Sequence, residues 1–135
     1  MHKLSLAVLC AAFVAAPALA QDSPTLKKIK DSGSITIGHR DSSMPFSYYD
    51  DQQKVVGYAL DICMKVVDAI KADLKMPNLQ VKLNPVTSAT RIPLIANGTI
   101  DLECGSTTNN LDRQKQVGFT NTYFVTANRY VAKKS

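Results

Sequence analysis

The stretch "VKLNPVTSATRIPLIANGTIDLECGS", residues 81–106, predicts the fold of this chain. It begins with the alternation of a β-strand, continues as a short apolar helix that ends at Gly98, and closes with a second strand, "GTIDLECGS". Pro93 has no amide hydrogen and therefore lies in the first turn, so the helix begins close to Thr90. A strand, a helix and a strand in this order predict parallel strands joined by a right-handed crossover.

The residues before this stretch extend the same pattern. "DSPTLKKIKDSG" predicts a short helix closed by Gly33, and "SITIGH" predicts a strand. Residues 40–58 carry turn signals and predict a loop or a hairpin rather than a helix. Residues 59–74 give the clearest helix, with an apolar core stripe of Ala59, Ile62, Cys63, Val66, Ile70 and Leu74. The sequence therefore predicts an α/β fold with a mostly parallel sheet and flanking helices.

Polar and basic residues follow each of the three expected parallel strands. Arg40 ends the first strand, Ser88 and Arg91 follow the second, and residues 105–113 follow the third. Ligands of α/β sheets bind at the carboxyl ends of the strands, so we expect these three loops to line one crevice.

The chemistry of these loops favours an anionic ligand. Arg91 stands among free backbone amides at a helix start, where a cation is unfavourable unless its partner is an anion. "GSTTNNLDR" repeats the pattern: Gly105 permits close backbone approach, hydroxyls follow, Asn109 or Asn110 caps a helix, and Arg113 lies in its first turn. Each arginine alone is open to another interpretation, a solvated surface charge. Three guanidinium groups in one crevice repel each other unless the occupant carries two negative groups, which favours a dicarboxylate.

Composition and motifs argue against other functions. The formal net charge of +5 is spread along the chain without a basic block, which argues against nucleic-acid binding. No hydrolase elbow, zinc-protease pair or phosphate-binding loop is present, and we predict no metal or other cofactor. His39 alternates away from Arg40, and its expected role is packing or a structural hydrogen bond. We expect the carboxylates near the loops to be mostly solvated or capping residues: Asp41, Asp50, Asp51, Asp101 and Glu103.

The N-terminus has the features of a secretory leader. Residues 1–20 contain Lys3, an apolar run and the small-residue end "ALA", so cleavage is expected after Ala20 and export to a Gram-negative periplasm. Cys63 and Cys104 remain in the mature chain. In an oxidising compartment they form either one disulfide or two buried free thiols, and the sequence leaves both alternatives open.

Three segments resemble a known family, the periplasmic polar amino-acid-binding proteins of ABC importers, and within it the glutamate/aspartate-binding branch. They are "GHRDSSMPFSYYDDQQKVVGYALDI", "PVTSATRIPLIANGTIDLECGSTTNNLDRQKQVGFT" and "TYFVTANRYVAKK". The resemblance implies a non-enzymatic, monomeric receptor that delivers L-glutamate or L-aspartate to a membrane permease. It also implies two α/β lobes that close on the ligand.

Site roles follow from the resemblance residue by residue. Arg113 stands at the family's position for the ligand α-carboxylate, supported by Ser106 and Thr108. The acidic branch holds the side-chain carboxylate at the positions of Arg40, Ser88 and Arg91. Gly105 completes the expected ligand-binding set.

The same resemblance sets the expected domain organisation. Residues 21–126 correspond to an incomplete first lobe, and residues 127–135 to the start of a hinge that crosses to a second lobe. Two alternatives remain for the function: a cyclohexadienyl or arogenate dehydratase-like enzyme on the same fold, or the sensing module of a longer protein.

Overall fold

The computed structural model describes residues 23–127 and 131–133. The expected leader, residues 1–20, lies outside the described residues, as does most of the expected hinge. The helices are α1 (Pro24–Ser32), α2 (Tyr58–Asp73), α3 (Arg91–Ala96) and α4 (Leu111–Gln114). The strands are β1 (Ser34–His39), β2 (Ser42–Ser43), β3 (Ser47–Tyr49), β4 (Val55–Val56), β5 (Gln80–Pro85) and β6 (Leu102–Cys104).

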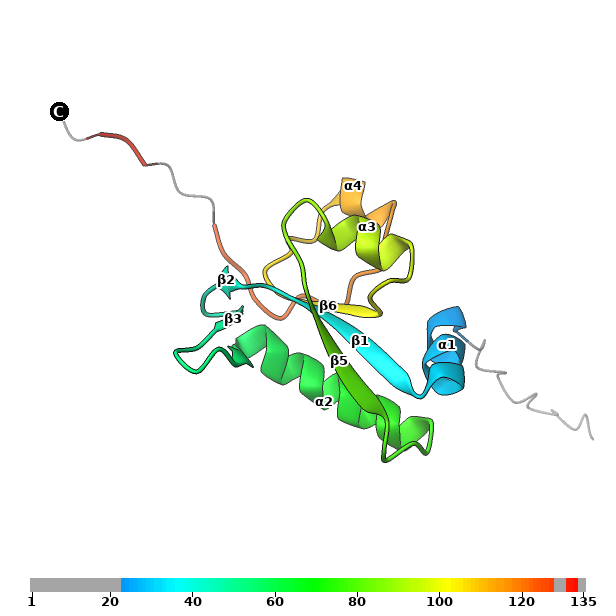
Figure 1. Ribbon diagram of the computed structural model, residues 1–135. Helices are drawn as coiled ribbons and strands as arrows, with labels where there is room; N and C mark the ends of the chain where they lie inside the picture. The colour runs from blue at the N-terminus through cyan, green and yellow to red at the C-terminus, as the bar shows by residue number, and fades with distance from the viewer. Residues whose placement is uncertain (1–22, 128–130, 134–135) are drawn as a thin grey trace, which may run out of the picture.

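The main sheet has three strands in the order β5-β1-β6. The central strand β1 pairs in parallel with both neighbours, and Ile37 lies opposite Leu83 on one side and Leu102 on the other. This confirms the parallel α/β sheet that the sequence predicts. Figure 1 shows α2 along one side of the sheet and α3 with α4 on the other. The loops after all three strands therefore open at the same edge.

Within residues 40–58, the strands β2, β3 and β4 form a small antiparallel sheet in that order, and Tyr58 already begins α2. Asp50 organises the turn between β3 and β4, because its carboxylate accepts hydrogen bonds from the amides of Gln52 and Lys54 at 2.9 and 2.8 Å. The hairpin alternative for this segment is thus confirmed. The segment lies beside the start of α2 and the carboxyl end of β1 (Figure 1).

Helix α2 buries a stripe that differs from the predicted one. Ala59 and Cys63 are buried as expected, but Val66 is 39% exposed, while Leu60 and Val67 are buried instead. The prediction that Val66 belongs to the core stripe is therefore wrong. Apolar residues stand in adjacent pairs along this helix, so two neighbouring stripes fit a period of 3.6 residues, and packing against the sheet selects between them.

The core lies between α2 and the main sheet. Its buried members include Ile29, Ile35, Ile37 and Leu79, which come from α1, β1 and the segment before β5. Cys63 of α2 and Cys104 of β6 belong to the same cluster and are joined by a disulfide, with Cα atoms 6.2 Å apart. Of the two alternatives for these cysteines, the structure has the disulfide. It ties α2 to the strand that precedes the loop at Gly105.

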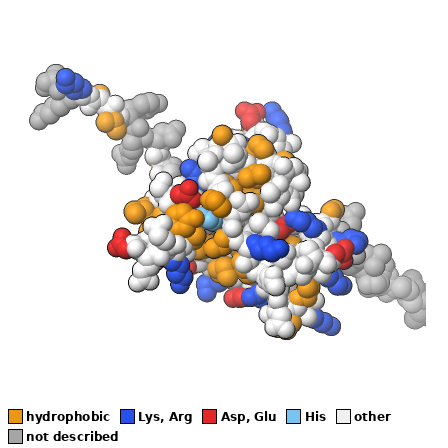
Figure 2. Space-filling model, in the orientation of Figure 1, with side chains coloured by type: hydrophobic (Ala, Val, Ile, Leu, Met, Phe, Trp, Pro, Cys, Tyr) orange, Lys and Arg blue, Asp and Glu red, His pale blue; other side chains and the backbone are white. Residues whose placement is uncertain are grey.

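Basic side chains are scattered over the visible face rather than gathered in one block (Figure 2). This distribution agrees with the even spread of charge along the sequence. No helix within residues 23–127 and 131–133 has the length and apolar character to cross a membrane.

Candidate anion-binding site

Two of the predicted site residues meet directly at the edge of the main sheet. The Arg40 guanidinium donates a hydrogen bond of 3.0 Å to the Ser88 hydroxyl. Arg40 follows β1, and Ser88 lies in the loop between β5 and α3. The parallel pairing of β1 with β5 brings both loops to one place, as the sequence predicts.

Arg91 is the first residue of α3 and is only 7% exposed. The alternative of a solvated surface charge is therefore wrong for this arginine. Its Nε makes no hydrogen bond within the described residues. Burial lowers the pKa of Arg91, the neighbouring charge of Glu103 raises it, and Arg113 and Arg40 lower it. A buried guanidinium near two others is unfavourable without an acidic partner.

Arg113 lies in the short helix α4, whose start is capped by Asn110. The Asn110 side chain accepts a hydrogen bond of 2.9 Å from the Arg113 amide. This confirms one of the two caps that the sequence allows. The Arg113 guanidinium donates to the Thr108 carbonyl at 2.8 Å. Arg113 thus contacts the backbone carbonyl of Thr108, and the Thr108 hydroxyl takes no part in this hydrogen bond.

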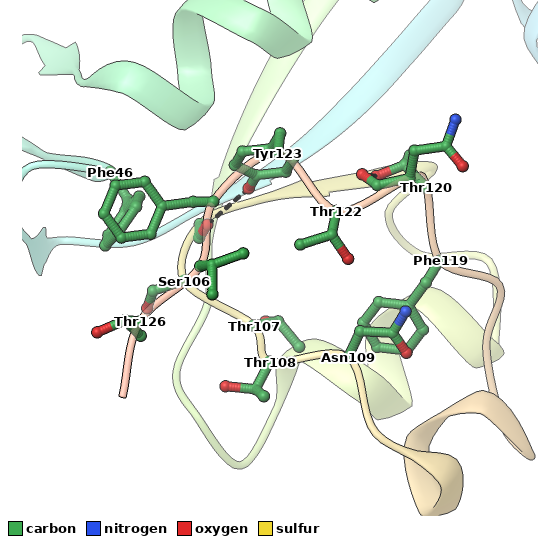
Figure 3. A pocket seen from close by; sticks show the side chains of 14 residues that line it. Phe46, Ser106, Thr107, Thr108, Asn109, Phe119, Thr120, Thr122, Tyr123 and Thr126 are labelled. Atoms are coloured by element: carbon green, nitrogen blue, oxygen red, sulfur yellow. Dashed lines mark hydrogen bonds between the residues drawn. The ribbon is translucent and has the colours of Figure 1, made fainter. Parts of the chain in front are cut away.

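Gly105 is buried where several site residues crowd together. A Cβ at this position would lie 2.5 Å from Glu103 Oε1 and 2.8 Å from Arg40 Cγ. The Tyr123 hydroxyl donates a hydrogen bond of 3.0 Å to the Gly105 carbonyl (Figure 3). The absence of a side chain therefore lets three segments of the chain approach each other closely.

Glu103 is a site residue that the sequence analysis missed. It lies on β6, and burial raises its pKa, while the nearby Thr107 hydroxyl and the charges of Arg91, Arg40 and Arg113 act in the opposite sense. The Thr107 hydroxyl is close enough to the carboxyl to lower this pKa, but the two groups do not have the geometry of a hydrogen bond. Its Oε1 is buried without a hydrogen-bond partner among the described residues. The expectation of a solvated or capping carboxylate is wrong for Glu103. A charged residue within the short apolar pattern of β6 was the signal that could have identified it.

The same expectation is wrong for Asp101. Its side chain is 2% exposed and pairs with Lys28 at 2.8 Å. It also accepts a hydrogen bond of 2.8 Å from the Thr36 amide. Asp101 therefore has a structural role, in which it ties α1 and β1 to the start of β6.

Two cavities flank the loop after β6. The first, here called the outer cavity, has a volume of about 300 Å³ and lies between this loop and residues 119–126. Figure 3 shows Ser106, Thr107 and Thr108 on one side of it, with Phe46 and Tyr123 from other segments. The second, the β6-edge cavity, has a volume of about 310 Å³. Its lining includes Arg91, Glu103 and Thr107.

The predicted residues thus divide among several positions. Gly105, Ser106 and Thr108 line the outer cavity, and Arg91 lines the β6-edge cavity. Arg40, Ser88 and Arg113 line neither cavity, although the charges of all three arginines act on Glu103. Within the described residues no group of three or more His, Cys, Asp or Glu side chains is placed to hold a metal ion. The arrangement offers guanidinium groups and hydroxyls, which recognise carboxylates.

Comparison with known proteins gives the family. The family model for bacterial extracellular solute-binding proteins, family 3, matches residues 35–135. A glutamate/aspartate import solute-binding protein of Salmonella typhimurium is 53% identical over 99% of this chain. An L-glutamate/L-aspartate-binding protein of Pseudomonas aeruginosa is 53% identical over 93% of this chain. The chain therefore belongs to the family 3 bacterial extracellular solute-binding proteins.

The matched region is only part of those relatives. The chain spans 46% of the Salmonella protein and 42% of the Pseudomonas protein, about half of their length. Solved structures support the same fold. An arginine-bound form of domain 1 from TmArgBP has a TM-score of 0.63 at 23% identity over 73% of this chain and 71% of its own. An ancestral cyclohexadienyl dehydratase also has a TM-score of 0.63 at 23% identity, over 73% of this chain and 38% of its own.

Proposed function

We propose that this chain is the ligand-binding part of a periplasmic receptor for acidic L-amino acids, L-glutamate and L-aspartate, which delivers them to an ABC transporter permease. One observation carries the proposal: the charges of three arginines, which follow β1, begin α3 and lie in α4, all act on Glu103 at the edge of the sheet. The names of the relatives that are 53% identical agree with it.

The arginines define the class of ligand. Three guanidinium groups and one carboxylate leave an excess of positive charge that a single carboxylate does not neutralise. A dicarboxylic amino acid supplies two carboxylates at the spacing of its side chain, and each charge-assisted hydrogen bond contributes about 1.5–3 kcal/mol. A basic amino acid would add a cation to this cluster and is disfavoured.

We assign the two ends of the ligand to two groups of residues. Arg113, Ser106 and Thr108 hold the α-carboxylate. Arg40 and Arg91, with Ser88, hold the side-chain carboxylate. The hydrogen bond between Arg40 and Ser88 supports the second group, because it orients that guanidinium before any ligand arrives.

A receptor role is favoured over the dehydratase alternative. The relatives named as solute-binding proteins are 53% identical, whereas the dehydratase structure is 23% identical and shares the fold alone. In this proposal the receptor is a monomer that needs no cofactor, forms no product from its ligand, and reaches the periplasm through the leader at residues 1–20.

Calorimetric titration of the purified chain tests the proposal. L-glutamate, L-aspartate, L-glutamine and L-lysine are injected separately, and mass analysis of the recovered ligand checks for turnover. Binding of the two acidic amino acids with clear preference over the amide and the basic one is expected, with every ligand recovered unchanged. Equal affinity for glutamate and glutamine, or the release of a new product, contradicts the proposal.

A further inference from the structure

Within the part of the chain that the structure describes, three buried side-chain polar atoms have no hydrogen-bond partner, and all three lie around one cavity. They are Arg91 Nε, Glu103 Oε1 and Thr107 Oγ1. The three residues line the β6-edge cavity together. Unsatisfied buried groups are costly, so three of them around one cavity require an explanation, such as a bound molecule or a functional role.

The backbone around Glu103 fixes the position of its carboxylate. Glu103 pairs with Gly38 of β1, and its Cγ would lie 3.7 Å from a Cβ at Gly38. Its Oε1 occupies the space that a side chain at Gly105 would need, and Arg40 Cγ borders the same space. Gly105 thus makes room for a carboxylate beside an arginine.

The arginines whose charges act on Glu103 come from three separate parts of the chain. Arg40 follows β1, Arg91 begins α3, and Arg113 lies in α4. From the segment after α4 comes Tyr123, whose pKa is raised by burial and then by the charges of Glu103 and Tyr58. Asp101 also lines the cavity, but it is already paired with Lys28 at 2.8 Å.

We propose that Glu103 balances the arginine cluster (Arg40, Arg91 and Arg113) in the ligand-free protein and takes up a proton from solvent when an anionic ligand binds there. This inference rests on the proposed function and adds a regulatory group to the same site. Glu103 is then a positioning residue that sets the charge of the cluster without contacting the ligand.

The physical reason is the competition of two anions for the same cations. When ligand carboxylates pair with the arginines, Glu103 loses part of its compensating attraction and gains repulsion from the ligand. Both changes raise the pKa of a carboxyl whose pKa burial already raises. Proton uptake removes the repulsion. The affinity for an acidic ligand therefore increases as the pH falls, by up to about tenfold per pH unit for one linked proton.

Calorimetric titration of L-glutamate in buffers of different ionisation enthalpy measures this proton directly. Because the pKa of Glu103 is raised, we expect the wild-type chain to take up as much as one proton per ligand somewhere in the range from the ordinary glutamate pKa, about 4.3, up to neutral pH. The matched variant Glu103→Gln keeps the shape of the side chain and should bind glutamate without that uptake. His39, which packs edge-to-face on Tyr49 at 5.4 Å, is retained in both proteins, so their difference isolates Glu103.

Two results overturn the inference. Glutamate binding without proton uptake at any pH in this range contradicts it, and so does an uptake that Glu103→Gln leaves unchanged. Failure of the chain to bind either acidic amino acid is a different outcome, because it removes the proposed function.

If no ligand binds, the charge balance between Glu103 and the arginines can still be tested in the ligand-free protein. The free energy of unfolding is measured for Glu103→Gln, for Arg91→Gln and for the double variant at neutral pH. If Glu103 balances the arginines, Glu103→Gln should increase the free energy of unfolding more in the Arg91→Gln background than in the wild-type chain. Additive effects of the two substitutions overturn the inference. Arg113→Gln replaces Arg91→Gln in the same cycle if the buried arginine variant does not fold, since Arg113 is only half-buried.

Discussion

The Arg40 guanidinium lies 3.0 Å from the Ser88 hydroxyl, although the two residues are 48 positions apart in the chain. This hydrogen bond joins the end of the central strand β1 to the loop that leads into α3. It positions one arginine of the cluster independently of any ligand.

Replacing Arg91 should affect acidic ligands selectively. We expect Arg91→Ala to weaken glutamate binding by about 10- to 150-fold, the value of one lost charge-assisted hydrogen bond of ~1.5–3 kcal/mol. Glutamine should lose much less, because its amide gains little from a guanidinium. Titration calorimetry measures both ligands. Lys82→Ala removes an exposed cation from β5 and serves as the control, with both affinities retained. Equal losses for glutamate and glutamine rule out the side-chain assignment.

Replacing Arg113 should affect every α-amino acid that binds. The α-carboxylate is common to all of them, so Arg113→Ala should weaken glutamate and glutamine by similar factors, again about 10- to 150-fold. Competition against a labelled ligand provides the measurement. If glutamate affinity survives this change, Arg113 does not hold the α-carboxylate.

A single methyl group at Gly105 should disturb the site. In Gly105→Ala the new Cβ would lie 2.5 Å from Glu103 Oε1 and 2.8 Å from Arg40 Cγ, so both side chains must shift. We expect a loss of about 1–3 kcal/mol in the free energy of unfolding, as for other overpacked sites, and weaker glutamate binding. Gly118→Ala is the matched control, because a Cβ there has no neighbour within 4 Å. If the denaturant melts of Gly105→Ala and Gly118→Ala coincide, the proposed crowding at Gly105 is refuted.

Reduction of the disulfide should destabilise the fold. Cys63 and Cys104 are 41 residues apart, and closing a loop of this length stabilises the folded state by about 4 kcal/mol in the chain-entropy model. Dithiothreitol should therefore lower the midpoint of a denaturant melt. The double variant Cys63→Ala with Cys104→Ala should have the lower midpoint already and should not respond to the reductant. A wild-type midpoint that reductant leaves unchanged would show that the disulfide contributes little.

The parallel sheet and most of its helices were predictable because local patterns specify them. Pro93 fixed the start of α3 to within a residue, and Gly33 ends α1 in the left-handed conformation with a φ of 66°. The order of strands and helices then placed Arg40 and Ser88 at one edge of the sheet. Their contact follows from topology, which the sequence pattern contains.

The burial of Arg91 and Glu103 was not predictable in the same way. Glu103 lies beside Arg40, and the charges of Arg91 and Arg113 also act on it, although these three arginines come from other segments that approach Glu103 only in the fold. The buried stripe of α2 was likewise ambiguous, because Val66 and Val67 are both apolar and only packing against the sheet selects Val67. Local patterns specify elements, whereas burial of a particular side chain is a tertiary property.

If the arginine cluster binds the acidic side chain of an amino acid, L-glutamate should stabilise the fold and L-glutamine should not. The thermal melt of the purified chain is followed by circular dichroism, with and without millimolar amounts of either ligand. A ligand that binds only the folded state raises the midpoint. We expect the midpoint to rise with glutamate and to stay nearly unchanged with glutamine. Equal shifts for the two ligands, or no shift with glutamate, would rule out recognition of the acidic side chain by the cluster.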